Sequence, residues 1–191
     1  YIDKFGDESE SAIQTHHLQS GEPAVELTFA FSVTDEITFS GHLDRVVRFG
    51  DDLFWMDQKT TTSSLGPHYF SSYKMTNQFH LYTIAGTTIL QSPVRGGILD
   101  AAQILPGESR FERAFISYTE DALEEWLRTA LSIIESAQEA TRRGFFPQNL
   151  TACGRYRGCE YRNICSASPR TRQHIIEGSY RHLPARNPLG D

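Results

Sequence analysis

The sequence predicts an α/β protein in which a mixed central β-sheet, led by an antiparallel meander, is flanked by helices. Three stretches rich in β-branched and aromatic residues follow one another between Ala24 and Lys59, as expected of strands. Gly50 and Asp51 separate the second stretch from the third and form a strong hairpin signal. A helical pattern then fills residues 119–143, so both strands and helices contribute to the fold.

The predicted elements follow in chain order. Residues 1–5 finish a helix, and residues 6–23 form a loop or a second short helix. Strands are predicted at 24–33, 37–49, 53–59, once or twice within 86–105, and at 110–118, with a loop at 61–69 and a helix at 72–85.

The helix at residues 119–143 carries the clearest end signals. Thr119 is a suitable N-cap residue, and Glu120 and Asp121 place acids in the first turn. Arginines occupy the last turn, and Gly144 predicts the end of the helix.

The composition predicts a globular protein. The 191 residues suffice for one domain, or for one domain with a small appendage, and 39% of them are hydrophobic. No apolar run is long enough to cross a membrane and no signal-peptide pattern opens the chain, so we expect a cytoplasmic protein. The first residue is Tyr rather than Met, and we expect that an N-terminal part is missing.

The charge is unevenly distributed. The net charge of −6 argues against a surface covered with basic residues for nucleic acid. From Arg142 onward, however, nine arginines are opposed only by Glu160, Glu177 and Asp191. This C-terminal stretch predicts either local contacts with phosphate or a solvated tail.

Charged residues interrupt the predicted strands. Side chains alternate along a strand, so Asp57 and Lys59 share a face, and a register that pairs the two strands around Asp51 brings Asp44 near Asp57. Glu26 on the first strand can join them. Burying such charges costs several kcal/mol per ion unless they are compensated, and a hard divalent cation compensates converging carboxylates. The alternative is an Asp–Lys pair on an exposed strand face.

Four short motifs occur in order: a strand glutamate at Glu26, G-x-x-D at Gly41–Asp44, D-x-K at Asp57–Lys59 and Q-x-x-x-Y at Gln78–Tyr82. Together they resemble the PD-(D/E)xK nuclease superfamily, and within it the RecB-like exonuclease branch, which includes CRISPR adaptation, AddB-type and phage nucleases. The resemblance runs from about residue 26 to residue 82 and resumes at the cysteines. It implies a restriction-endonuclease-like core at residues 1–145 and a Cys-stapled segment with a tail at 146–191.

The resemblance also implies a catalytic role for each of the charged residues. Asp44 and Asp57 would ligate Mg²⁺ or Mn²⁺, with Glu26 binding directly or through water and the backbone carbonyl of Gln58 as a further ligand. Lys59 would position or activate the attacking water and neutralise charge in the transition state.

Gln78 and Tyr82 lie one helical turn apart and, by the same resemblance, border the site and touch the DNA backbone. The alternative is a surface Gln78 and a Tyr82 that packs the helix on the sheet. The implied function is metal-dependent DNA cleavage in recombination, repair or phage DNA processing, and exonuclease activity is expected. DNA and a helicase or other repair subunit are the expected partners, and a nucleoid-associated or phage-encoded protein fits this function. The rival hypothesis is an inactive nuclease fold that only binds DNA or protein.

Cys153, Cys159 and Cys165 are equally spaced and close enough in sequence to hold zinc with a fourth ligand, or an iron–sulfur cluster. The resemblance implies a [4Fe–4S] cluster whose fourth ligand is not in this chain. Loss of the cluster, His174 as a replacement ligand, three structural thiols and a zinc-stabilised scaffold are the alternatives.

Three histidines lie near the predicted acids Glu26 and Asp44. His16 and His17 are predicted to lie in a loop, and the metal-binding histidine of RecB-like enzymes is expected before Tyr1 or is absent. His42 alternates to the face of Asp44, either beside the site or packed in the strand.

Overall fold

The computed structural model describes residues 2–5, 11–154 and 158–184, so parts of the predicted N-terminal loop, cysteine segment and tail lie outside the described residues. Among the described residues, the chain forms two compact units, the first ending at Arg128 and the second beginning at Thr129. The first unit contains the sheet, and the second contains the three cysteines. The predicted domain division after residue 145 stays a prediction.

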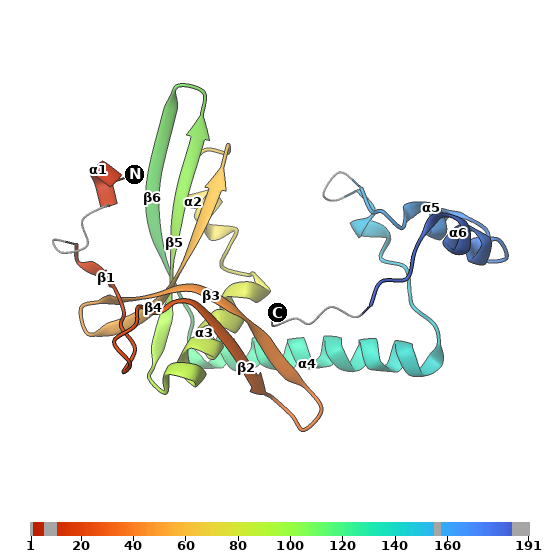
Figure 1. Ribbon diagram of the computed structural model, residues 1–191, viewed down its shortest axis with the longest axis horizontal. Helices are drawn as coiled ribbons and strands as arrows, with labels where there is room; N and C mark the ends of the chain where they lie inside the picture. Colours follow the sequence, from red (N-terminus) through yellow and green to blue (C-terminus); the bar gives the residue numbers. More distant parts are fainter. Residues whose placement is uncertain (1, 6–10, 155–157, 185–191) are drawn as a thin grey trace. The chain divides into compact units, whose positions relative to one another are not determined.

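In the described part of the chain, six strands form one mixed sheet (Figure 1): β1 Ile13–Thr15, β2 Val25–Ser32, β3 Thr38–Phe49, β4 Asp52–Thr61, β5 Val94–Leu105 and β6 Glu108–Ser117. The order is β1-β3-β4-β5-β6, and β2 pairs with the first part of β3. β2, β3 and β4 are antiparallel, as the predicted meander requires. β4 and β5 are parallel, because the chain between them crosses over through a helix, and β5 and β6 form an antiparallel hairpin. The predicted mixed sheet is confirmed.

The helices are α1 Ile2–Phe5, α2 Pro67–Ser71, α3 Asn77–Leu90, α4 Glu120–Arg143, α5 Arg162–Ser166 and α6 Arg172–Ser179, with a 3₁₀ turn, η1, at Leu150–Ala152. The long predicted helix is confirmed together with both of its end signals. The hydroxyl of Thr119 accepts the Ala122 N–H at 3.3 Å, and Gly144 adopts a φ of 61° directly after the last helical residue.

Three boundaries differ from the sequence prediction. α2 begins at Pro67, inside the predicted loop, because proline suits the first turn of a helix. The helix predicted at residues 72–85 instead begins at Asn77 and continues to Leu90 as α3. Residues 94–105 form one long strand. Residues 13–15 form β1 rather than a loop or helix, because their backbone groups pair with the end of β3.

β3 and β4 pair along only part of their length. Their register ends where Arg45 faces Met56. Beyond this point residues 38–43 of β3 pair with β2, and residues 57–61 of β4 pair with β5. Figure 1 shows the resulting fork: the β2–β3 hairpin leaves in one direction, while β4, β5 and β6 continue in another.

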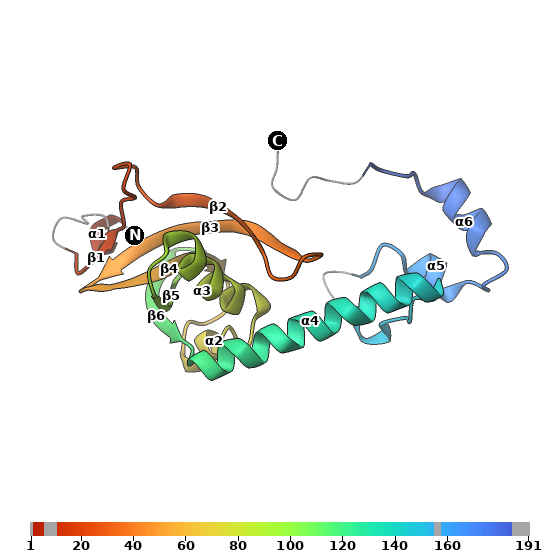
Figure 2. The ribbon, with the colours of Figure 1, turned by 90° about the horizontal axis from the view of Figure 1, so that it is seen from below.

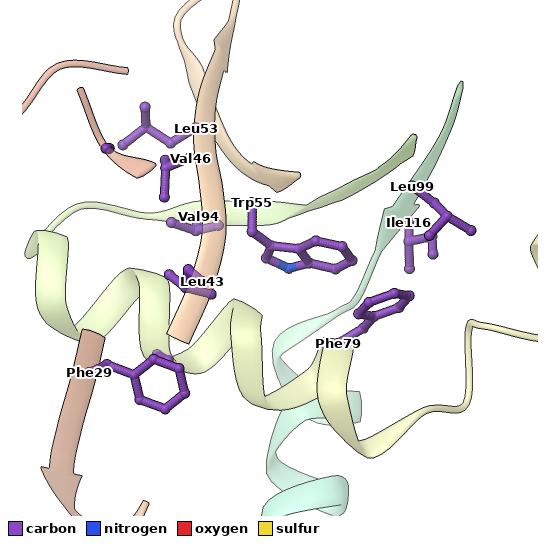
Figure 3. Packing of buried hydrophobic residues seen from close by; sticks show 11 residues of the cluster. Phe29, Leu43, Val46, Leu53, Trp55, Phe79, Val94, Leu99 and Ile116 are labelled. Carbon is purple, nitrogen blue, oxygen red and sulfur yellow. The ribbon is translucent and has the colours of Figure 1, made fainter. Parts of the chain in front are cut away.

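The main core of the first unit lies between the sheet and α3 (Figure 2). The indole of Trp55 stacks on the ring of Phe79 with a centroid distance of 4.4 Å (Figure 3). The indole N–H donates to the hydroxyl of Thr83 at 2.8 Å. A Cβ atom on Gly97 would lie 2.1 Å from this indole, so only glycine lets the ring lie on β5. A smaller cluster on the opposite face of the sheet consists of Val47, Phe54, Met56 and Ile98.

Trp126, in the first turns of α4, packs against α3 within the first unit. Its indole N–H donates to the side-chain oxygen of Asn77 at 2.9 Å, and its ring stacks on His80 with a centroid distance of 5.7 Å. These contacts hold the start of α3, which carries Gln78 and Tyr82, at a fixed place on the sheet.

The cysteine staple predicted for residues 146–191 is not seen. Cys153, Cys159 and Cys165 are free thiols, and among the described residues no three His, Cys, Asp or Glu side chains are placed to hold a metal ion. Cys153 follows η1, whereas Cys165 is exposed on α5. The three thiols alone cannot supply the four ligands of a [4Fe–4S] cluster, and the described residues do not gather them with His174 at one point.

Candidate active site

Asp44 and Asp57 lie at the fork between β3 and β4. Because Arg45 faces Met56, Asp44 and Asp57 are the next two residues in register, as predicted from the hairpin at Gly50. Two carboxylates directly opposite each other in a continuous ladder would repel. The strands part at this step, so the fork accommodates both acids.

Asp57 is buried, with 1% of its surface exposed. Its Oδ2 atom lies 2.5 Å from the ammonium of Lys59, and its Oδ1 atom accepts a hydrogen bond from the amide of Gln78 at 3.3 Å. Burial raises the pKa of Asp57; Lys59 opposes this rise, and the charge of Asp44 adds to it. The end of the β3–β4 register at Arg45 and Met56 places the two acids next to each other.

Lys59 lies on the same face of β4 as Asp57, as the alternation predicts, and its side chain is 27% exposed. Its ammonium also lies 5.8 Å from the centroid of the Phe79 ring, within the range of a cation–π interaction. Lys59 is therefore held between a buried carboxylate and an aromatic face, with one side open to solvent.

Gln78 and Tyr82 lie on one face of α3, and Gln78 connects this helix to Asp57. The Gln78 amide donates to the Tyr82 hydroxyl at 2.9 Å as well as to Asp57. Burial raises the pKa of Tyr82, and the nearby charges of Asp44 and Asp57 act in the same direction. Gln78 is thus not a free surface residue: its amide links the helix to the carboxylate at the fork.

Glu26 lies opposite Asp44, between the pairs Val25–Arg45 and Leu27–Leu43. Its φ of 51° is in the left-handed region, which interrupts the ladder at this residue. Strained backbone of this kind is common at functional sites. Glu26 and Asp44 line one pocket of about 550 Å³, together with Gln58, His17 and five other residues.

The structure therefore brings Asp44, Asp57, Lys59, Gln78 and Tyr82 together and places Glu26 at the adjoining pocket. Among the described residues, Glu26, Asp44 and Asp57 are not placed so that all three carboxylates could hold one metal ion. A pair of carboxylates nevertheless fits Mg²⁺, which is usually held by one or two carboxylates with water and substrate phosphate. Apart from its ion pair with Lys59, Asp57 Oδ2 has no hydrogen-bond partner among the described residues, so it retains capacity to bind a cation.

Tyr69 and Tyr73, which the sequence interpretation did not single out, border the same group. Their hydroxyls lie 3.3 Å apart, and Tyr73 stacks on Phe79 with a centroid distance of 5.7 Å. Burial, Tyr73 and the charge of Asp57 together raise the pKa of Tyr69. The only signal in the sequence was the aromatic content of a stretch that was predicted to be part loop, part helix.

The histidines differ in their surroundings. His17 is exposed and lines the pocket with Glu26 and Asp44. His42 is exposed and shares a hydrogen bond with the hydroxyl of Thr28 at 3.0 Å, so the expectation of a packed strand histidine is wrong.

A comparison with known protein families matches residues 7–166 to the PD-(D/E)XK nuclease superfamily. The match covers more than half of the chain, and the chain belongs to this superfamily. Membership implies hydrolysis of phosphodiester bonds in a nucleic-acid substrate. A comparison with curated proteins found no match.

In the described part of the chain, no helix combines the length and the apolar character needed to cross a membrane.

Proposed function

We propose that this protein is a nuclease that cleaves DNA with the help of Mg²⁺ or Mn²⁺, and that the fork between β3 and β4 is its active site. The observation that carries the proposal is the buried Asp57, paired with Lys59 and facing Asp44. Keeping a carboxylate whose pKa is raised by burial lowers stability at neutral pH. A residue kept at such a cost is a candidate for chemistry.

The carboxylates of Asp44 and Asp57 would hold the cation, with Glu26 and the backbone carbonyl of Gln58 as further ligands. Glu26, Asp44 and Gln58 line one pocket. A bound divalent cation supplies Lewis acidity to a phosphoryl oxygen and favours deprotonation of the attacking water. The protein must therefore hold two anions together until the cation arrives. The ion pair with Lys59 does this by offsetting part of their repulsion.

The ammonium of Lys59 would provide a second positive charge for the reaction, in addition to that of the bound cation. Phosphodiester hydrolysis gathers negative charge on the phosphoryl oxygens in the transition state, and a fixed ammonium stabilises it. The partly exposed side of Lys59 can donate a hydrogen bond to a phosphate oxygen or to the attacking water while Asp57 keeps the side chain in place.

Within the superfamily we propose the RecB-like branch and exonuclease activity in recombination, repair or phage DNA processing. The support is the Q-x-x-x-Y motif, because the Gln78 amide donates both to the Tyr82 hydroxyl and to Asp57, the aspartate of the D-x-K motif. A cluster bound by Cys153, Cys159 and Cys165 is not part of this proposal. The rival, an inactive binding module, is disfavoured because a binding surface has no need for a buried Asp57 next to Asp44.

The test is cleavage of end-labelled single- and double-stranded DNA with Mn²⁺, Mg²⁺ or EDTA. We expect cleavage with either metal and none in EDTA, and a loss of about 10²–10³-fold for Lys59→Ala, the usual cost of removing one transition-state donor. The ladder of products gives the polarity and separates exonuclease from endonuclease activity.

Lys74→Ala is the matched control, because Lys74 is an exposed lysine of the same unit outside the site. It should cleave like the parent. If the folded parent protein does not cleave DNA with either metal, the nuclease proposal is wrong and a binding role replaces it. If the parent and Lys59→Ala cleave equally, the role proposed for Lys59 and for the fork as the active site is wrong.

We expect Gln78→Leu to raise the Mn²⁺ concentration needed for half-maximal cleavage by about 10–100-fold, because partners that orient a metal ligand commonly contribute this much. Tyr82→Phe, which removes only the second acceptor of the amide, should have a smaller effect. A metal titration of the cleavage rate measures both. A Gln78→Leu variant with an unchanged metal midpoint but weaker DNA binding would instead place Gln78 on the DNA backbone.

A further inference from the structure

The second unit differs sharply in charge from the first. Residues 129–187 contain nine arginines and four glutamates, a formal charge of +5. The rest of the chain contains nine basic and 20 acidic residues, a formal charge of −11. Charges are screened beyond about 8–10 Å at physiological ionic strength, so the basic unit presents its own local field. A polyanion such as nucleic acid is attracted by this unit and repelled by the average surface of the other.

Two Tyr-Arg dipeptides meet on this unit. Tyr161 stacks on Tyr180 with a ring-centroid distance of 5.8 Å and an interplanar angle of 24°. The Tyr180 hydroxyl donates to the backbone carbonyl of Glu160 at 2.7 Å, which fixes the pair. Arg162 and Arg181 each directly follow one of the stacked tyrosines in the chain. We call Tyr161, Arg162, Tyr180 and Arg181 the Tyr–Arg surface.

The arginines of the Tyr–Arg surface are available to a ligand. Arg162 and Arg181 are exposed, and neither guanidinium has an ion-pair or hydrogen-bond partner among the described residues. Other arginines of the unit have such partners: Arg142 and Arg143 bind Glu139. Arg172 donates to three backbone carbonyls, those of Ile164 and Cys165 in α5 and that of Ala167 directly after it.

The aromatic part of the surface is also open. Tyr161 keeps 51% of its surface exposed even though it stacks on Tyr180. A partly exposed ring held by a second ring is preorganised to receive a base, and such stacking contributes strongly to binding of single strands. The bases of a duplex are already stacked on one another and cannot reach it.

We infer that the Tyr–Arg surface binds single-stranded nucleic acid, with Arg162 and Arg181 on the phosphates and Tyr161 stacked on a base. The choice of nucleic acid rests on the proposed nuclease function. The surface gives the chain a contact with its substrate that is separate from the acids of the fork, and it supplies the positive charge that the first unit lacks.

The test is the binding of a fluorescent oligothymidylate to the full chain in EDTA, where no cleavage occurs, across a series of salt concentrations. We expect the double variant Arg162→Gln/Arg181→Gln to bind more weakly and to reduce the slope of log K against log salt by about 1.4, or about 0.7 for each lost phosphate contact. Arg162→Lys/Arg181→Lys, which keeps the charge, should retain most of the slope.

The matched control is Arg95→Gln/Arg110→Gln. It makes the same change in net charge on exposed arginines that already pair with Asp52 and Glu108. Its salt slope should stay that of the parent. Equal losses in both Gln variants would show that net charge alone acts, and no loss in either would show that the surface does not bind nucleic acid; each result overturns the inference.

The aromatic contact is tested by Tyr161→Ala and Tyr161→Phe. Alanine should weaken binding of the single strand by about 5- to 150-fold, the range found for one stacked base, while phenylalanine keeps the ring and the affinity. A duplex of the same length should bind more weakly and respond little to Tyr161→Ala. A duplex that binds as tightly and loses as much would overturn the assignment to single strands.

Binding in EDTA is measured whether or not the chain cleaves DNA. The loss of this surface and the failure of the proposed active site are therefore distinguishable: the first changes the EDTA isotherms, and the second shows only as missing cleavage with metal. Circular dichroism of each variant, which should match the parent, ensures that folded proteins are compared.

Discussion

Replacing Asp57 by asparagine is expected to abolish metal-dependent cleavage and at the same time to raise the thermal stability of the metal-free protein at neutral pH. The asparagine side chain would keep the shape and the hydrogen bond with Gln78 but could no longer pair with a cation. The loss of activity follows from the missing charge at the fork, where Asp44 alone would remain.

The gain in stability follows from the pKa of Asp57. Burial raises it above the ordinary value of 3.8, against the opposing effect of Lys59, so the folded protein binds this proton more tightly than the unfolded chain does. The contribution of the proton to stability is fully present below the ordinary pKa and is lost as the pH rises through the raised one. Asparagine does not titrate and avoids this loss. Lys59 is partly exposed, so water can hydrate it once its partner is neutral.

Thermal melts in EDTA between acidic and neutral pH measure this effect. The parent should lose stability with rising pH in this window relative to Asp57→Asn. Added Mn²⁺ should stabilise the parent, by about 2.7 kcal/mol at 100 times its Kd, and leave the variant unchanged.

Asp52→Asn is the control, because Asp52 is an exposed aspartate at the start of the same strand and its carboxylate pairs with exposed Arg95. It should leave both cleavage and the metal effect intact. If Asp57→Asn still cleaves, or if Mn²⁺ stabilises it as much as the parent, Asp57 does not hold a metal.

Gly97→Ala is expected to destabilise the protein by about 3 kcal/mol or more, at the upper end of the usual cost of overpacking. The added Cβ atom would lie 2.1 Å from the indole of Trp55. That ring cannot move away, because it stacks on Phe79 and donates to Thr83. Since Trp55 lies two residues before Asp57 on β4, its displacement would also disturb the site.

Urea unfolding of Gly97→Ala compared with the parent measures the loss. Gly178→Ala is the control: no atom lies within 4 Å of its Cβ position on α6, and alanine there should be neutral or slightly stabilising. A smaller side chain at Trp55 should cost less in the Gly97→Ala background than in the parent, because it removes the clash. If the free energy of unfolding lost in the double variant equals the sum of the losses in the two single variants, the alanine at position 97 and Trp55 do not clash.

Local signals predicted much of this fold. Thr119 and Gly144 predicted the ends of α4, because capping depends on residues within one turn of the helix end. The hairpin at Gly50 predicted that Asp44 lies near Asp57, because a short turn fixes the register of the strands it joins. The shared face of Asp57 and Lys59 needed only the alternation of a strand.

Other predictions failed where distant contacts decide. Residues 13–15 form a strand because β3 offers them a partner, which no local pattern encodes. The cysteine staple, predicted from spacing and resemblance, is not seen, since equal spacing does not turn three thiols toward one point.

The sequence by itself determined the elements and the order of the charged motifs, because alternation, capping and turns act over a few residues. Only the tertiary structure decided that β3 turns away with β2 while β4 stays with β5, and so opened the fork at Asp44 and Asp57. It alone brought Gln78 of α3 to Asp57 across 21 residues of chain and gave Glu26 its left-handed backbone. The physical reason is that pairing partners and packing are chosen by the free energy of the whole core, in which segments remote in sequence compete for the same strand edges and buried surface.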